Sequence, residues 1–287
     1  MRGAALALGI MVVLAAAASL FVASRRRSEV ARLRGELVSD VERGGIAHLG
    51  RAQALGRRLY VADPDDEESA AALAFTSAVL ALDYGFNTAR EAETILARLD
   101  SAQRLREEEA GAGSAGVAAA ARALCSLQAG NGPAAVREAA AAVAAWPEGP
   151  HPLFALGRAR ALTGDLAGAA RALEAATVGS PAFSEAQVSW AEVRLDMGDA
   201  SAARAALEGV LARAPGNPRA DLLLDEAEQA LGVTNTDALR RACPDAGALS
   251  PVIQAGCTLA RALRARRAGK RKEALGRLAG VAGAVPG

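Results

Sequence analysis

Residues 162–181 read LTGDLAGAARALEAATVGSP, and residues 196–215 read DMGDASAARAALEGVLARAP. Both stretches carry a Gly-Asp pair, and both place an alanine five, a leucine nine and a proline seventeen residues after the glycine. The second stretch begins 34 residues after the first. One unit is therefore repeated, and this repeat decides the fold.

The same step of 34 residues extends beyond these two stretches. It links Gly130, Gly164, Gly198 and Gly232; it also links Ala135, Ala169 and Ala203, and Pro147, Pro181 and Pro215. Residues 267–286, RAGKRKEALGRLAGVAGAVP, repeat the internal spacing of the unit once more from Gly269. Three marks that share one period indicate an array of equivalent structural units.

Each mark suits a helical hairpin. A glycine can take the left-handed conformation that ends one helix, and Asn131, Asp165 or Asp199 can then cap the next helix. The alanine lets the two helices approach closely, the leucine fills the seam between them, and the proline prevents continuation. A single hairpin leaves an apolar face open, which a neighbouring hairpin covers, with each buried leucine contributing about 1.5–3 kcal/mol.

These residues resemble the tetratricopeptide repeat (TPR), clearly over 116–217, partially in the helix from Pro218, and again over 255–286. Leu156-Gly157 matches the family's Leu-Gly pair, whereas large aromatic positions hold Leu153, Arg160 and Leu173. The resemblance implies an all-α fold, a right-handed superhelical solenoid of antiparallel helical hairpins.

Weaker helical periodicity precedes the clear repeats. We expect degenerate hairpins from helices over 28–43 and 46–62, then 67–84 and 88–108, with a loop over 110–116. The expected division is an N-terminal anchor with a basic flank (1–27), the degenerate hairpins (28–115) and the solenoid (116–287), with repeats at 116–149, 150–183, 184–217, 218–250 (partial) and 255–287.

The N-terminus reads as a single transmembrane helix. Residues 3–24 are uncharged and, at about 1.5 Å per residue, can cross a hydrocarbon layer of roughly 30 Å, so membrane contact is expected through residues 4–23. Val22-Ala23-Ser24 leaves a cleavable signal peptide as an alternative. The basic residues Arg25–Arg27 follow the span, which favours a bacterial inner-membrane protein with a cytoplasmic body; a periplasmic body is the alternative.

Composition narrows the function. The sequence holds 33 basic and 32 acidic residues, so its formal charge of +1 gives no global reason to expect nucleic-acid binding. His48 and His151 are isolated, and the three cysteines form no CxxC pair, so we expect no metal, no cofactor and no enzyme activity. A Cys243–Cys257 disulfide would require an oxidising compartment, and the sequence leaves it open.

Three local motifs that could indicate a binding site are explained more simply by the expected helices and loops. Gly111–Gly116 matches GxGxxG, but a polar helix precedes it where a phosphate-binding loop needs a buried strand. The acidic run Asp65–Glu68 suits the start of a helix. The basic run Arg261–Lys272 is expected to form a solvated face, with acidic lipid, an acidic partner or RNA as open alternatives.

In the family that the repeats resemble, the first helices of successive hairpins line a concave groove for a peptide or a helix of another protein. By position, this resemblance implies groove residues His151, Phe154, Arg158, Val188, Glu192, Leu195, Leu222 and Glu226. We therefore expect a membrane-anchored scaffold that binds a protein client and assists assembly of a membrane or envelope complex. The alternative is a periplasmic factor in secretion or envelope biogenesis, and the oligomeric state stays open.

Overall fold

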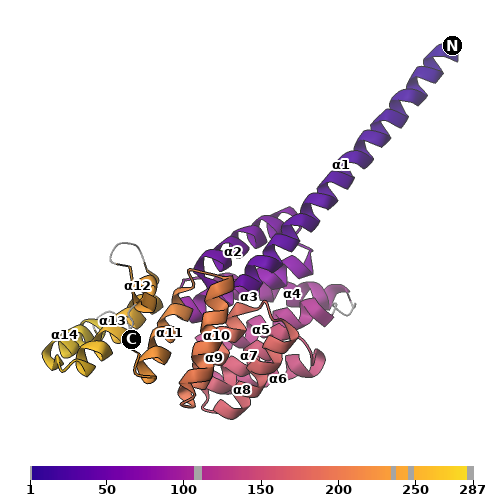
Figure 1. Ribbon diagram of the computed structural model, residues 1–287. Coiled ribbons are helices and arrows are strands. Elements are labelled where there is room, and N and C mark those ends of the chain that lie inside the picture. The colour runs from indigo at the N-terminus through magenta and orange to yellow at the C-terminus, as the bar shows by residue number, and fades with distance from the viewer. Residues whose placement is uncertain (1, 107–111, 234–236, 245–248, 283–287) are drawn as a thin grey trace.

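The computed structural model describes residues 2–106, 112–233, 237–244 and 249–282, and every regular element in these ranges is a helix (Figure 1). For residues 2–16, 18, 103–106, 112 and 280–282 it describes the backbone alone. The helices are α1 (Arg2–Arg43), α2 (Gly45–Ala62), α3 (Glu67–Tyr84), α4 (Ala89–Arg106), α5 (Ala112–Gln128), α6 (Gly132–Ala145), α7 (Pro150–Leu162), α8 (Leu166–Gly179), α9 (Ser184–Asp196), α10 (Ala200–Arg213), α11 (Pro218–Ala230), α12 (Asp237–Ala242), α13 (Pro251–Arg267) and α14 (Arg271–Ala282).

The repeat glycines occupy equivalent bends, as predicted. Gly130, Gly164, Gly198 and Gly232 have φ angles of +77°, +90°, +85° and +76°, each immediately after the first helix of a pair. This left-handed region is strained for residues that carry a Cβ atom. The period in the sequence is thus the period of the helical hairpins α5–α6, α7–α8, α9–α10 and α11–α12.

The residue after each of the first three bends caps the next helix, which also confirms the prediction. The side chains of Asn131, Asp165 and Asp199 each accept a hydrogen bond from the backbone N–H three residues later, at 3.2, 2.8 and 3.1 Å. Each cap satisfies one of the free N–H groups at a helix start, an interaction worth about 1 kcal/mol. Local sequence therefore fixes where the second helix of each hairpin begins.

The seam within each hairpin is built from the small and large residues of the repeat. Ala169 and Leu173 of α8, like Leu207 of α10, are fully buried. A Cβ atom added at Gly157 would lie 2.4 Å from Cγ of Leu173, so the glycine of the Leu-Gly pair is needed for α7 and α8 to approach. The small residues compensate for the scarcity of aromatic side chains by bringing the helices closer together.

Helix α3 lies inside the molecule rather than at its edge. Fourteen of its 18 residues are buried, and it packs against α1, α2, α4, α5 and α13. Its sequence, EESAAALAFTSAVLALDY, is apolar around most of its circumference, which is typical of a helix enclosed on all sides. Helices α1 and α2 pack against each other, as do α3 and α4, and the first pair also reaches the solenoid, because α1 touches α9 and α2 touches α11. The division of the chain at residues 27 and 115 stays a prediction.

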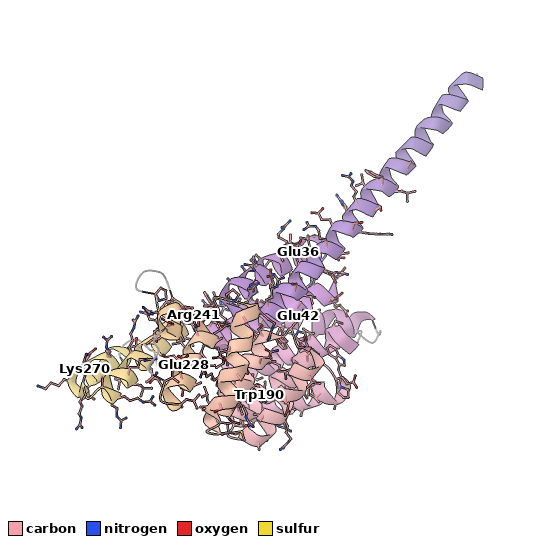
Figure 2. All side chains as sticks on the ribbon, viewed as in Figure 1. Glu36, Glu42, Trp190, Glu228, Arg241 and Lys270 are labelled. Atoms are coloured by element: carbon pink, nitrogen blue, oxygen red, sulfur yellow. A yellow bond between two sulfur atoms is a disulfide. The ribbon has the colours of Figure 1, made fainter. Side chains whose placement is uncertain are left out.

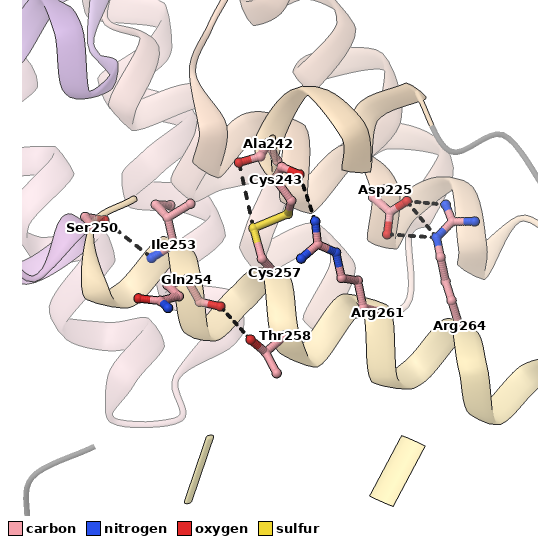
Figure 3. Close-up of a disulfide and its surroundings, with 10 residues drawn as sticks. All are labelled: Asp225, Ala242, Cys243, Ser250, Ile253, Gln254, Cys257, Thr258, Arg261 and Arg264. Carbon is pink, nitrogen blue, oxygen red and sulfur yellow. Dashed lines mark hydrogen bonds and ion pairs between the residues drawn. A yellow bond between two sulfur atoms is a disulfide. The ribbon is translucent and has the colours of Figure 1, made fainter. Parts of the chain in front are cut away.

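A disulfide joins the last two helical pairs. Cys243, directly after α12, is bonded to Cys257 of α13, with the two Cα atoms 5.7 Å apart (Figure 3). Arg261 donates a hydrogen bond to the carbonyl of Cys243 at 2.8 Å and strengthens the same junction. The pairing that the sequence left open is therefore made, while Cys125 is buried with a free thiol.

The structure differs from the sequence prediction at two places in the N-terminal half, the loop expected over 110–116 and the helix start expected at Ser28. The loop expected over 110–116 is wrong from residue 112 onward, because α5 begins at Ala112; residues 110 and 111 lie outside the described residues. Helix α1 runs without a break from Arg2 to Arg43, so the expected anchor and the helix expected from Ser28 are one element. Among the residues whose side chains the structure describes, which leave out 2–16 and 18, no helix combines the length and apolar character needed to cross a membrane.

Candidate functional site

The eight predicted groove residues lie on α7, α9 and α11, the first helices of three successive hairpins. The side of these helices where a client was expected is partly occupied by the chain itself. Phe75, Asp83 and Tyr84 of α3 contact side chains of all three helices. The groove is therefore divided by α3, and the predicted residues fall into those that contact α3 and those that border open space.

His151 and Phe154 belong to an aromatic cluster around Phe75. The ring centroid of Phe75 lies 4.7 Å from that of His151 and 6.0 Å from that of Phe154, and Phe183 lies 5.1 Å from Phe154. Burial lowers the pKa of His151 to about 4, so the ring is neutral near pH 7. Phe154 is fully buried and serves as core, whereas His151 also borders a cavity.

Arg158 takes part in a buried group of charges. Its guanidinium pairs with Asp83 of α3, and its Nη1 lies 2.8 Å from Oε2 of Glu192 on α9. Arg219 of α11 lies on the other side of Asp83, with Nη1 3.3 Å from Oδ2. The carboxylate at the end of α3 is thus held by two arginines from two different repeats, in a region where an unpaired charge would be costly.

Glu185, at the start of α9, connects this group to the N-terminal hairpin. Its Oε1 accepts hydrogen bonds from Tyr84 Oη at 2.9 Å and from the backbone N–H of Gly45 at 2.7 Å. Its Oε2 lies 3.4 Å from Arg219. Burial raises the pKa of Glu185, an effect that Arg219 opposes and Asp83 reinforces. One carboxylate therefore ties α2, α3, α9 and α11 together.

Glu192 lies at the exposed edge of the same group. Its Oε2 lies 2.5 Å from Arg219 and 2.8 Å from Arg158. Burial alone would raise its pKa, but the attraction of Arg219 and Arg158 outweighs that effect and lowers the pKa to about 2. Glu192 is therefore ionised over the physiological range and neutralises one of the two arginines.

The remaining predicted residues divide in the same way. Val188 of α9 is fully buried in an apolar cluster with residues of α10 and α11, and Leu195 packs against this cluster. Leu222 and Glu226 border a hollow of about 260 Å³ between α11 and α13, whose other wall includes Leu259 and Leu263. Their use in client binding stays a prediction, but these two side chains are accessible, whereas Phe154 and Val188 are not.

A second hollow lies beyond the aromatic cluster, where α1, α3, α5 and the starts of α7 and α9 meet. Its volume is about 370 Å³, and its walls are mainly apolar. His151 borders it, and Glu42 of α1 lies at its edge; Figure 2 shows Glu42 where α1 meets the helical body. The concave side thus retains two open sites, one on each side of the contacts made by α3.

The sequence interpretation missed Glu185 and Arg219, although a signal for them exists. The step of 34 residues from His151 leads to Glu185 and then to Arg219, so all three occupy the same position in successive first helices. No comparable signal exists for Asp83 or Tyr84, because α3 lies outside the clear repeats. Only the folded chain brings these two residues against the groove.

The basic run is partly used by the fold. Arg264 pairs with Asp225, and Arg267 donates a hydrogen bond to Gln229 at 3.1 Å, both on α11. Arg261 is half-buried through its bond to Cys243, whereas Arg266, Lys270, Arg271 and Lys272 are exposed. Figure 2 places Lys270 at the end of the molecule opposite the start of α1. In the described ranges, no group of His, Cys, Asp or Glu side chains could hold a metal ion.

Comparisons with known proteins identify the fold. No known family profile and no curated protein matches the sequence. Human IFIT1 with m7Gppp-AAAA is similar at 13% identity and a TM-score of 0.62, over 83% of this chain and 55% of that one. The APC/C Cut9–Hcn1 heterotetramer matches at 13% identity with a TM-score of 0.61; the match covers 81% of this chain and 42% of the matched chain. A tetratricopeptide repeat protein from Parabacteroides merdae matches at 12% identity with a TM-score of 0.51; the match covers 90% of this chain and 94% of that protein.

The chain thus spans about half the length of the first two proteins and nearly the whole of the third. At these identities the likeness concerns the fold alone. The fold is TPR-like, as the repeated residues implied.

Proposed function

We propose that this chain is a stoichiometric scaffold, without catalytic activity, that binds a protein client on the concave side of its repeats. The observation that carries the proposal is the accessible hollow bordered by Leu222 and Glu226. It borders α9 and α11, which carry predicted groove residues, and its lining combines apolar side chains with four carboxylates and two arginines, which suits contact with another polypeptide. The buried charges near it are paired with one another, which is consistent with a structural use.

We also propose that residues 4–23 anchor the chain in a membrane and confine the scaffold to its surface. The support is the uncharged stretch in the sequence, followed directly by Arg25–Arg27. Confinement to a surface raises the effective concentration of a client in the same membrane, so moderate affinity suffices. This arrangement suits a role in assembling a membrane or envelope complex.

The side of the membrane is the point on which two observations differ. Arg25–Arg27 favour a cytoplasmic body, whereas the Cys243–Cys257 disulfide favours an oxidising compartment such as the periplasm. We give more weight to the disulfide, because basic residues beside a span only bias its orientation, whereas a lasting disulfide depends on an oxidising compartment. The proposed location is therefore the periplasmic side of the inner membrane.

Site-specific photocrosslinking tests client binding. A photoreactive amino acid at Leu222, in the full chain in its native membrane, is expected to give a discrete adduct. The same group at Val178, which is 76% exposed on α8, serves as the control. Equal labelling from both positions would contradict the proposal.

Thiol labelling tests the compartment. Cys243 and Cys257 are expected to resist a maleimide reagent in untreated cells and to react after reduction and unfolding, whereas free thiols in untreated cells would place the body in the cytoplasm. Fusions of the C-terminus to a reporter active only in the periplasm and to one active only in the cytoplasm give an independent answer.

A further inference from the structure

The hollow beside His151 has the build of a small binding cavity. Its wall is formed by apolar side chains from five parts of the chain, namely Val38, Val41, Phe75, Val117, Trp146 and Phe183. Its volume of about 370 Å³ falls within the usual range of ligand pockets, roughly 300–1,000 Å³. Val38 is 47% exposed, so an apolar surface remains open to solvent at this point.

His151 supplies a polar group inside this apolar wall. Its Nδ1 is buried and has no hydrogen-bond partner, while the ring stacks edge-on against Phe75. A neutral imidazole carries one N–H and one lone pair, and leaving the lone pair on the buried Nδ1 places the N–H on Nε2. The ring can then donate one hydrogen bond to an acceptor in the cavity, such as a peptide carbonyl.

The edge of the cavity is acidic. Glu42 of α1 and Glu68 of α3 both border it. Glu42 accepts a hydrogen bond from Ser180 at 3.3 Å, and among the described side chains no cation pairs with it. Arg34 lies 3.7 Å from Glu68 but also pairs with Asp66 at 2.6 Å, so it only partly offsets the negative charge. The edge therefore attracts a cation and repels an anion.

We propose that this cavity binds a segment of a partner protein that carries a bulky apolar side chain next to a lysine or arginine. The apolar side chain enters the cavity, His151 donates to the backbone of the segment, and the basic side chain pairs with Glu42 and Glu68. A fatty acid or a phospholipid would also fill the apolar wall, but its carboxylate or phosphate would face these two carboxylates. The inference rests on the proposed function, because it specifies the kind of client segment.

Binding of short synthetic peptides tests the two parts of this recognition separately. The probes are capped, fluorescently labelled hexapeptides with a central Phe-Lys, Phe-Glu or Ala-Lys pair in a Gly/Ser background, together with laurate as a competitor. The full chain is held in nanodiscs, so that no free detergent occupies the cavity. Fluorescence anisotropy is expected to show Phe-Lys binding about tenfold more tightly than either other peptide. Equal affinities, or displacement by laurate at lower concentration than by unlabelled Phe-Lys peptide, would overturn the proposal.

Matched variants locate the binding. Val38→Trp fills the cavity from its exposed edge and is expected to weaken Phe-Lys binding about tenfold, whereas Val61→Trp, at a 79% exposed valine on α2, leaves it unchanged. Circular dichroism melts of both variants check that the fold is retained. If Val38→Trp is folded and binds as tightly as the unaltered chain, the cavity is not the site.

The charge part has its own control. Glu42→Gln combined with Glu68→Gln is expected to remove the preference for Phe-Lys over Phe-Glu, while Glu174→Gln, at an exposed carboxylate on α8, keeps it. A preference that survives the double substitution would refute the role of the acidic edge. Crosslinking from Leu222 reports on the other hollow, so a client captured there together with failed peptide binding would refute this inference and leave the proposed function intact.

Discussion

Asp83 of α3 and Arg219 of α11 form an ion pair across the concave side of the repeats, although 136 positions separate them in the chain. Oδ2 of Asp83 lies 3.3 Å from Nη1 of Arg219, and the aspartate side chain is fully buried. The same carboxylate pairs with Arg158 of α7. The contact joins the N-terminal helices to the solenoid, so α3 packs against the concave side of the repeats rather than extending the row of hairpins.

Removal of Asp83 should therefore destabilise the whole molecule. Asp83→Ala leaves two buried guanidinium groups short of a partner, and breaking a buried pair in this way costs about 3–5 kcal/mol. Asp65→Ala is the control, because Asp65 is exposed and lies 3.9 Å from Arg98, a geometry worth a few tenths of a kcal/mol. Urea unfolding of the full chain measures both. Similar midpoints for the two variants would show that the buried pair does not hold α3 in place.

The bends of the hairpins offer a test of backbone conformation alone. A Cβ atom at Gly198 would meet nothing within 4 Å, but the φ angle of +85° is unfavourable for alanine, so Gly198→Ala should cost about 1–2 kcal/mol. Gly35 also has open space around it but lies within α1, where alanine should stabilise the helix by about 0.5–1 kcal/mol. Opposite shifts of the thermal midpoint are expected. A stabilised Gly198→Ala variant would contradict the role given to the repeated glycine.

The hairpins could be predicted from the sequence because their determinants are local. A glycine with positive φ, a capping side chain on the next residue and an alanine at the helix contact all act within one unit, and the repetition makes them visible. At Gly164 and Asp165 the structure agrees with the prediction in both conformation and hydrogen bonding.

The position of α3 could not be predicted in the same way, because it depends on contacts between distant parts of the chain. The apolar circumference of EESAAALAFTSAVLALDY indicates an enclosed helix but does not say which surface encloses it. Groove positions taken from a family resemblance assume an open concave side. Phe154 and Arg158 occupy the expected positions, yet they contact α3 because this chain fills part of its own groove.

The disulfide should hold the last helices onto the solenoid. Cys243 and Cys257 are 14 positions apart, and closing a loop of about this length is worth about 3 kcal/mol in the chain-entropy account. A Cys243→Ser, Cys257→Ser double variant should therefore expose the segment around α12 to protease at lower urea concentration than the unaltered chain, and reducing agent should have no further effect on it. Cys125→Ser is the control for loss of a buried thiol. Equal protease resistance of the double variant and the unaltered chain would refute this stabilisation.

The neutral, buried His151 predicts a loss of stability in mild acid. The folded-state pKa of about 4 lies below the ordinary value of 6.5, so between these values the unfolded chain binds a proton that the folded chain does not. The stability that the folded state has through its neutral imidazole is fully present above pH 6.5 and is lost progressively as the pH falls toward 4. At pH 5 the free energy of unfolding is lower by about 2 kcal/mol.

His151→Gln removes the titrating group and should reduce the difference between the free energies of unfolding at pH 7.5 and pH 5 by that amount. Urea titrations of both proteins at the two pH values measure the difference, and the other titrating groups cancel in the comparison. An unchanged pH dependence in His151→Gln would mean that the imidazole titrates alike in the folded and unfolded chains, contrary to its burial between Phe75 and Phe183.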